Sequence, residues 1–182
     1  MIKIFKTTDS GVLQISEFED NSWISMTNPT TEELFSVSST YKIAPDDLRA
    51  SLDEEERSRI EIEEYYSLIL VDIPTIEERN GKDWYGTIPL AIIICDKVIV
   101  TVCLEDSPVL TAFMDGRVRN FYTHMKTRFI FQILYRNATL YLNYLRIIDR
   151  RSDAIEQKLH EATKNRELIE LLELEKSLVF FT

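Results

Sequence analysis

Hydrophobic and polar positions alternate along much of the first 104 residues, and turn-forming residues interrupt the alternation at intervals. Alternation is typical of strands with one buried face, whereas short continuous apolar runs, as at 92–94 and 98–100, are typical of strands buried on both faces. The pattern predicts strands at 2–7, 12–18, 23–27, 59–64, 65–73, 84–95 and 98–104. Pro74 is expected to end the fifth strand, and a polar turn at 76–83 around Asn80-Gly81 is expected to follow it.

A capping residue or a proline marks the start of each of three short predicted helices. Thr30 or Thr31 can cap the first helix, with Glu33 or Glu32 near the third position as the reciprocal partner. The second helix is expected at 45–52 and the third at 107–114, where Gly116 ends it.

Glycine and proline are absent from Arg117 to Thr182, a stretch of 66 residues. Because these residues are the strongest helix breakers, the stretch predicts a long helical arm. Apolar stripes spaced by three, four or seven favour an antiparallel hairpin of about 45 and 15 residues, with its weakest helical point at 163–165. The stripes are Leu134, Tyr141, Leu145, Ile148, Ile155, Leu159 and Ala162, followed by Leu168, Leu171, Leu172 and Leu178.

These elements predict an α+β or α/β fold in which a mixed sheet is sandwiched by short helices and followed by the long helical hairpin. The predicted domains are a head at 1–116 and an arm at 117–182. From 129 to 148 the arm is apolar on most sides, so the head, a partner helix or another subunit should cover it.

Charge separates the same two regions. The head carries 9 Lys+Arg and 23 Asp+Glu, a net charge of −14, whereas the arm carries 12 and 8, a net charge of +4. An acidic head repels nucleic acid and attracts cations, so no nucleic-acid partner is expected. No signal peptide opens the chain, no window reaches the ~18 apolar residues needed to span a bilayer, and two separated cysteines, Cys95 and Cys103, fit a reduced compartment.

The candidate chemistry lies in an acidic cluster rather than in a catalytic motif. His124 and His160 are isolated, and no phosphate loop, nucleophile elbow or zinc pattern is present, so we do not expect an enzyme. The cluster consists of Asp46, Asp47 and Asp53 with the three glutamates that follow. Magnesium takes one or two carboxylates and keeps several waters, so this cluster is a candidate weak site for Mg²⁺ or another divalent cation. The alternative is a solvated helix end without a ligand.

Two adjoining segments resemble the CorA family of magnesium channels. The first is Ile43-Ala-Pro-Asp-Asp-Leu48, and the second runs from Glu56-Arg-Ser-Arg-Ile-Glu61 to Tyr65-Tyr-Ser-Leu-Ile-Leu-Val71. The positions that match the family motif are Arg57, Arg59, Glu61 and Tyr65. The order of the remaining strands and helices is also similar, so the resemblance covers essentially the whole chain.

The resemblance implies a homopentameric transporter on the cytoplasmic side of the plasma (inner) membrane, gated by intracellular magnesium. Relative to the family, this chain stops before the longest helix, the two membrane helices and the Gly-Met-Asn loop, and its Phe180-Phe181 end suggests that the protein continues. By this resemblance the family's acidic sensing positions correspond to Arg49 and Ala50, and to Ala138 and Asn143 on the long helix, so the sensing site cannot be transferred residue by residue. Asp46, Asp47 and Asp53 are the nearby substitutes.

The resulting hypothesis is a cytosolic regulatory domain that senses a divalent cation and couples to the pore. Its expected partners are its own subunits, divalent cations and the missing C-terminal membrane helices. The main alternative is a stand-alone cytosolic oligomeric interaction module whose arm docks a partner. A magnesium-dependent hydrolase is a third reading, for which the sequence offers no nucleophile.

Overall fold

The computed structural model describes residues 1–79, 81–161 and 165–181. The contacts group the chain into two units: Met1–Ile73 with Ile88–Tyr135, and Pro74–Thr87 with Arg136–Thr182. This grouping differs from the predicted head and arm, because the tip of a β-hairpin belongs to the same unit as most of the helical arm.

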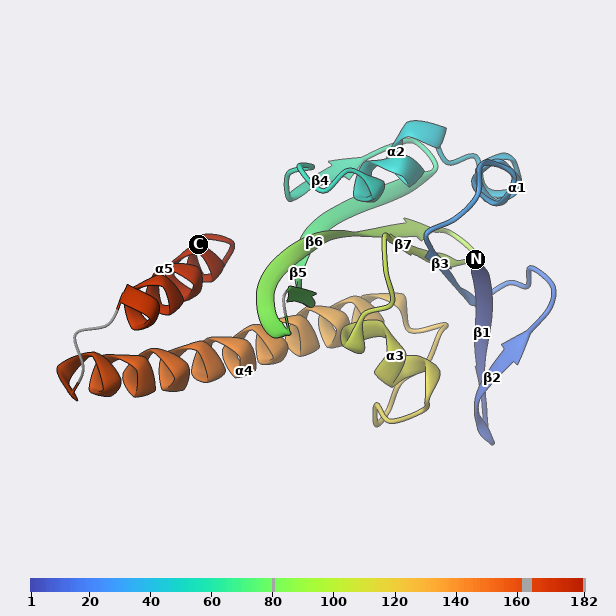
Figure 1. Cartoon of the computed structure of the whole chain (residues 1–182). Helices are drawn as coiled ribbons and strands as arrows, with labels where there is room; N and C mark the ends of the chain where they lie inside the picture. Colours follow the sequence, from blue (N-terminus) through green and yellow to red (C-terminus); the bar gives the residue numbers. More distant parts are fainter. Residues whose placement is uncertain (80, 162–164, 182) are drawn as a thin grey trace. The chain divides into compact units, whose positions relative to one another are not determined.

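A seven-stranded mixed sheet has the order β2-β1-β3-β7-β6-β5-β4 (Figure 1). The strands are β1 Ile2–Thr8, β2 Gly11–Ile15, β3 Trp23–Thr27, β4 Arg59–Ile62, β5 Tyr66–Arg79, β6 Lys82–Cys95 and β7 Ile99–Cys103. β3 pairs with β7 in parallel, whereas β1 pairs antiparallel with both β2 and β3. The β6–β7 register places Leu90 opposite Cys103, which confirms the predicted hairpin and keeps the two thiols apart.

Helices α1 (Thr31–Tyr41) and α2 (Pro45–Arg49), with the 3₁₀ turn η1 (Ala50–Leu52), cover one face of the sheet (Figure 1). Thr30 caps α1 in a capping box: its hydroxyl accepts from the Glu33 N–H at 3.3 Å, and the Glu33 carboxylate accepts from the Thr30 N–H at 2.9 Å. The sequence prediction of this cap is confirmed. Leu34, Val37 and Leu48 then place their side chains in the core.

The opposite face is covered by α3 (Pro108–Met114) and the first turns of α4 (Lys126–Glu161). Trp23 is fully buried there, and its indole N–H donates to the Thr101 hydroxyl at 2.9 Å. Its ring lies 5.0 Å from Phe129, 6.1 Å from Phe121 and 6.3 Å from Phe113, measured between centroids. This aromatic cluster fixes the start of α4 on the sheet.

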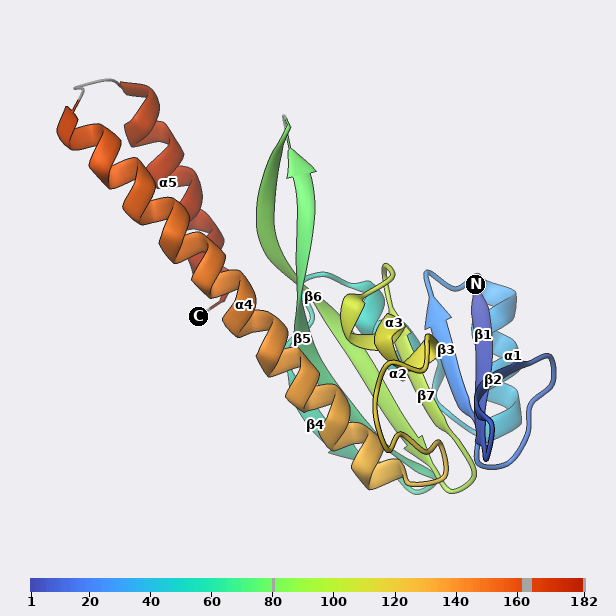
Figure 2. The same cartoon turned by 90° about the horizontal axis from the view of Figure 1, so that it is seen from below.

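In the second unit, α4 and α5 (Asn165–Val179) run side by side as an antiparallel pair (Figure 2). Tyr85 at the hairpin tip packs against Tyr144 and Ile148 of α4, and both tyrosines and Ile148 are buried. Phe181 meets the Tyr141 ring at 5.3 Å, so the end of the chain packs back on α4. The predicted antiparallel hairpin is confirmed, although the expected break at 163–165 lies largely outside the described residues.

Two element bounds differ from the sequence prediction by five residues or more. β5 does not stop at Pro74 but continues to Arg79, so the polar turn expected at 76–83 is mostly strand. The arm's helix begins at Lys126 rather than at 117. Tertiary contacts hold residues 117–125, which lie between the predicted and the observed start of the helix, as a loop. Phe121 is buried, and the Thr123 N–H donates to the Thr7 hydroxyl at 2.9 Å. A lack of glycine and proline permits helix but does not require it.

The stripe predicted for the second helix is wrong at three of its four positions. Leu168, Leu172 and Leu178 are 51%, 48% and 40% exposed. Leu171 is partly buried, as are Leu174 and Phe181, and Ser177 is buried. On α4 the prediction is confirmed at Ile148 and Ile155, which are buried. The side chains of Leu159 and Ala162 lie outside the described part of the chain.

Candidate functional site

The candidate acidic residues lie on and just after α2, and the structure gives each a different partner. Asp46 stands in the first turn with its side chain 98% exposed, 3.7 Å from the Arg49 guanidinium. Asp47 points toward the sheet and accepts a hydrogen bond from the Tyr66 hydroxyl. Asp53 follows η1, and its carboxylate accepts from the Glu55 N–H at 3.0 Å. Asp46 and Asp53 are exposed, whereas Asp47 is partly buried.

Tyr66 is the residue of this region that sequence reasoning missed. Its hydroxyl accepts from the Ala44 N–H at 3.2 Å while donating to Asp47, so it ties the start of α2 to β5. Burial, reinforced by the neighbouring Asp47 carboxylate, raises the pKa of Tyr66 to about 12. The available sequence signal was the alternation of Tyr66, Leu68 and Leu70, which places the tyrosine on the buried face. This alternation does not indicate that the Tyr66 hydroxyl contacts Asp47.

Within the described residues, no group of three or more His, Cys, Asp or Glu side chains is arranged to hold a metal ion. Asp46 and Asp47 share one turn, and the contacts above give Asp53 a separate, local partner. A magnesium ion that keeps most of its waters requires only one or two carboxylates. A divalent-cation site at Asp46, Asp47 and Asp53 therefore stays a prediction, with Asp46 as an almost fully exposed ligand.

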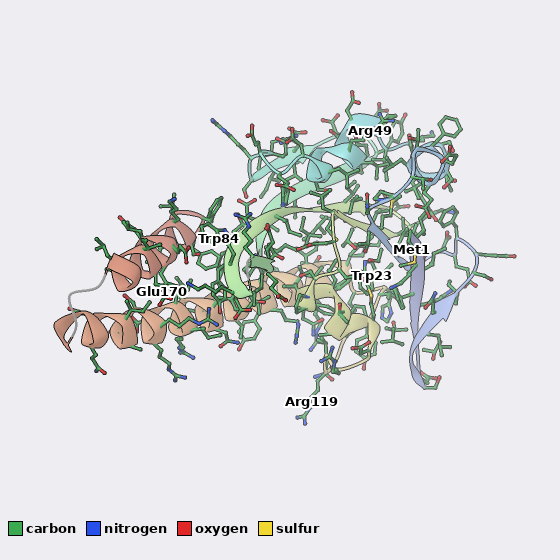
Figure 3. All side chains as sticks on the ribbon, in the orientation of Figure 1. Met1, Trp23, Arg49, Trp84, Arg119 and Glu170 are labelled. Carbon is green, nitrogen blue, oxygen red and sulfur yellow. The ribbon has the colours of Figure 1, made fainter. Side chains whose placement is uncertain are left out.

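The positions aligned with the family's sensing acids have no acidic character here. Arg49 is half exposed at the end of α2 (Figure 3) and Ala50 is buried in η1. Ala138 and Asn143 lie exposed on α4. The Arg49 guanidinium adds positive charge beside Asp46, which works against a cation bound by that carboxylate alone.

Two residues of the family motif, Arg59 and Glu61 of the edge strand β4, form a local charge network with Glu56. The Arg59 guanidinium lies 2.5 Å from a Glu56 oxygen and 2.6 Å from a Glu61 oxygen, and these partners raise the pKa of Arg59. Arg57 is exposed, and its backbone N–H donates to Glu56 at 3.1 Å. Tyr65 presents its ring to the Lys42 ammonium, 4.5 Å from the centroid. Arg59 thus orders one end of the acidic run and neutralises part of its charge.

A second feature, which the sequence did not suggest, is a cleft of about 560 Å³ in the unit that contains the hairpin tip and the helices. It lies between the hairpin tip, α4 and α5 and is lined by Arg79, Gly81, Lys82, Asp83, Trp84, Arg151, Ala154, Ile155, Glu170, Glu173 and Leu174. Its cationic and anionic side chains pair with one another: Lys82 with Glu170 and Glu173, and Arg151 with Asp83. The cleft therefore has little net charge to offer a ligand. Its charged side chains serve to join the hairpin to α4 and α5.

The two cysteines do not contribute to a site. Both are buried and unpaired by a disulfide, and burial raises the pKa of Cys95 to about 11 and that of Cys103 to about 12. A protonated, buried thiol is a poor nucleophile and a poor metal ligand.

Comparison with known proteins gives concordant results. The family model described as "CorA-like Mg2+ transporter protein" matches residues 18–182. The cobalt/magnesium transport protein CorA of Methanocaldococcus jannaschii is 30% identical over 168 residues, which cover 87% of this chain and 50% of that protein. This chain therefore spans about half the length of that relative.

Two solved structures from the same organism share the fold. The complete CorA magnesium transporter superposes with a TM-score of 0.84 at 22% identity, over 100% of this chain and 58% of that one. The soluble domain of CorA superposes with a TM-score of 0.83 at 23% identity, over 100% of this chain and 73% of that one. None of the helices in the described ranges combines the length and apolar content needed to cross a membrane. The match of the family model across nearly the whole sequence establishes that this chain belongs to the CorA-like Mg²⁺ transporter family.

Proposed function

We propose that this chain is the cytosolic regulatory domain of a CorA-like transporter of magnesium or another divalent cation. In this proposal it lies on the cytoplasmic side of the plasma (inner) membrane, responds to the intracellular cation and couples that response to the pore. The observation that carries it is the family match over residues 18–182. The superposition of the whole chain on part of a complete transporter supports it.

The proposal assigns no catalytic step to the chain. The named relative is a transport protein, and the acidic region described above has the exposed carboxylate expected of a weak cation site rather than a nucleophile. Its partners in the complete protein are other copies of the same subunit, with a pentamer implied by the family resemblance, and the membrane helices of that protein.

The transport part is tested with the complete reading frame, purified and reconstituted in liposomes that hold a magnesium-sensitive dye. We expect Mg²⁺ influx that slows when Mg²⁺ is raised on the side of the domain. A reading frame without membrane helices, or a complete protein that carries no divalent cation, would overturn the transporter assignment. Transport that ignores Mg²⁺ on the domain side would overturn the sensing part alone.

The sensing part is tested on this chain by thermal unfolding with and without MgCl₂ at constant ionic strength. A ligand at ten times its Kd stabilises a fold by about 1.4 kcal/mol, which raises Tm by about 3–5 °C for a chain of this size. The double variant Asp46→Asn and Asp53→Asn should lose this shift. Asp115→Asn is the matched control, because Asp115 is a half-exposed acid paired with Arg117 at 2.6 Å away from α2. An unchanged Mg²⁺ shift in the double variant would remove these two residues from the site.

The stand-alone interaction module remains the second candidate, because one face of α5 is apolar and exposed. Leu168, Ile169, Leu172, Val179 and Phe180 are each about half exposed or more. Isolated apolar side chains are common on surfaces, but five of them along one short helix favour a covered face. The reading-frame test decides between the two candidates, since the module requires no membrane helices.

A further inference from the structure

Within the second unit, the tip of the β5–β6 hairpin contacts both helices of the arm, but by different chemistry. The α4 contact is largely apolar: the Tyr85 and Tyr144 rings lie 5.4 Å apart in an edge-on arrangement, and Ile148 is 1% exposed. Arg151 strengthens it, because its guanidinium lies 2.5 Å from the Asp83 carboxylate and 5.5 Å from the centre of the Tyr85 ring. Because buried aromatic and aliphatic surface supplies most of this seam, salt should weaken it much less than a contact made of exposed ion pairs.

The contact of the same hairpin with α5 is mainly ionic. The Lys82 ammonium lies 3.1 Å from a Glu170 oxygen and 3.3 Å from a Glu173 oxygen, and these partners raise the pKa of Lys82. The Lys82 side chain is 50% exposed, and those of Glu170 and Glu173 are 24% and 45% exposed. Exposed ion pairs contribute little individually and are screened by salt. Figure 3 labels Trp84 of the hairpin and Glu170 of α5.

The apolar hold on α5 is also weaker than that on α4. The residues that α5 and the turn after it bring to the shared cluster, Leu174 and Phe181, are only partly buried. A helix of 15 residues is marginal in water without tertiary contacts. Its outward face carries Leu168, Leu172 and Val179, so the helix has apolar surface on both sides. Such a helix has a second surface on which it can pack if it leaves the hairpin.

We propose that Lys82, Glu170 and Glu173 form an ionic clasp that holds α5 closed on the hairpin, and that α5 is the movable element of the arm. Opening the clasp releases α5 while α4 stays attached through Tyr85, Tyr144 and Ile148. Removing the Lys82 charge also takes away a cation that offsets the repulsion between Glu170 and Glu173, which lie one helical turn apart. The clasp goes beyond the proposed transport function and does not depend on it.

The test is hydrogen exchange of the full chain, comparing backbone amides of α5 at 168–179 with those of α4 at 144–155. Lys82→Met keeps most of the side chain's apolar stem and removes its charge. We expect α5 exchange to rise about fivefold, the size of two exposed ion pairs, with α4 unchanged. Arg79→Met is the matched control, because Arg79 lies on the same hairpin but pairs with Glu77 of its own strand at 2.7 Å.

Salt and charge reversal give independent readouts. In about 1 M NaCl, where the screening length falls to about 3 Å, α5 exchange in the unsubstituted chain should approach that of Lys82→Met. Lys82→Glu combined with Glu170→Lys and Glu173→Lys should restore protection that Lys82→Glu alone removes. Equal α5 exchange in the unsubstituted chain, Lys82→Met and Arg79→Met would overturn the proposal. An equal rise in α4 exchange in Lys82→Met would also overturn the proposal, because the Lys82 contact would then not hold α5 in particular.

Discussion

Replacing Phe129 by alanine tests whether the aromatic cluster fixes the first turns of α4 on the sheet. Phe129 is fully buried, and its ring centroid lies 5.0 Å from Trp23, 5.0 Å from Phe113 and 4.6 Å from Phe121. Truncating a buried phenylalanine costs about 3–5 kcal/mol, and each lost aromatic pair adds about 0.5–1.5 kcal/mol beyond area burial. We therefore expect a loss in the upper part of this range, about 4–5 kcal/mol.

The matched control is Phe131→Ala, which makes the same chemical change two residues along the same helix. Phe131 is 67% exposed, so its truncation should change the free energy of unfolding by no more than about 0.5 kcal/mol. The two variants share any effect on helix propensity, because both place alanine in the interior of α4. The difference between their losses of unfolding free energy therefore measures the contribution of burying the Phe129 ring.

The assay is urea unfolding followed by tryptophan fluorescence in a Trp84→Phe background, in which the signal comes from Trp23 in the cluster. Thermal unfolding should show Phe129→Ala melting about 10–15 °C below its background. A loss below about 2 kcal/mol, or a loss equal to that of Phe131→Ala, would refute the assignment of the cluster as the anchor of α4.

Three further outcomes follow from contacts in the first unit. Thr30→Ala removes one half of the capping box and should lower the free energy of unfolding, measured in urea, by about 1 kcal/mol. Thr30→Ser keeps the capping hydroxyl and should therefore lose little stability, so equal losses in the two variants would contradict the cap. The Lys126 ammonium donates to the backbone carbonyls of residues 95 and 96, so Lys126→Met should cost about 1–3 kcal/mol. Lys97→Met removes only the exposed ion pair of Lys97 with Asp20 in the same turn and should cost less than about 0.5 kcal/mol. Equal costs of the two substitutions in urea unfolding would exclude a special role for Lys126. Burial raises the pKa of Cys95 to about 11 and that of Cys103 to about 12, from 9.0. The thiol contribution to stability is therefore complete below about pH 8.5 and is lost as pH rises toward 12, because the unfolded chain ionises first. Unfolding titrations from pH 7.5 to 11 should show a decline that Cys103→Ala reduces, and a decline of unchanged size in that variant would contradict this origin.

Local determinants of the fold could be predicted from the sequence. The Thr30 cap and β3 at Trp23–Thr27 were both found, because a capping box and a short strand can be recognised from residues within a few positions of each other. The start of α4 could not be found in this way, since residues 117–125 are excluded from the helix by the burial of Phe121 and the hydrogen bonds of Thr123 with Thr7. Those contacts join positions 116 residues apart.

The face of α5 illustrates a different limit. Leu168 and Leu172 form as good an apolar stripe as Leu174 and Phe181, so periodicity alone cannot decide which face turns inward. The candidate site shows both limits together. Acidic residues could be assigned to α2, but the Tyr66 hydroxyl that engages Asp47 and the Lys82 contact with Glu170, 88 residues away, arise only in the folded chain.

The parallel pairing of β3 with β7 has a consequence for synthesis of the protein. Trp23–Thr27 pairs with Ile99–Cys103, so β3 can form its hydrogen bonds with β7 only after Cys103 has been synthesised. At about 5–20 residues per second, the 72 positions from Thr27 to Ile99 take roughly 4–15 s to translate. During that interval β1, β2 and β3 can form a three-stranded antiparallel sheet with β1 in the middle. The outer edge of β3 then has no partner, and Trp23, Ile24 and Met26 lack their final cover. An unpaired apolar edge of this kind recruits other strands, so the yield of folded protein should depend on how quickly the ribosome delivers β7.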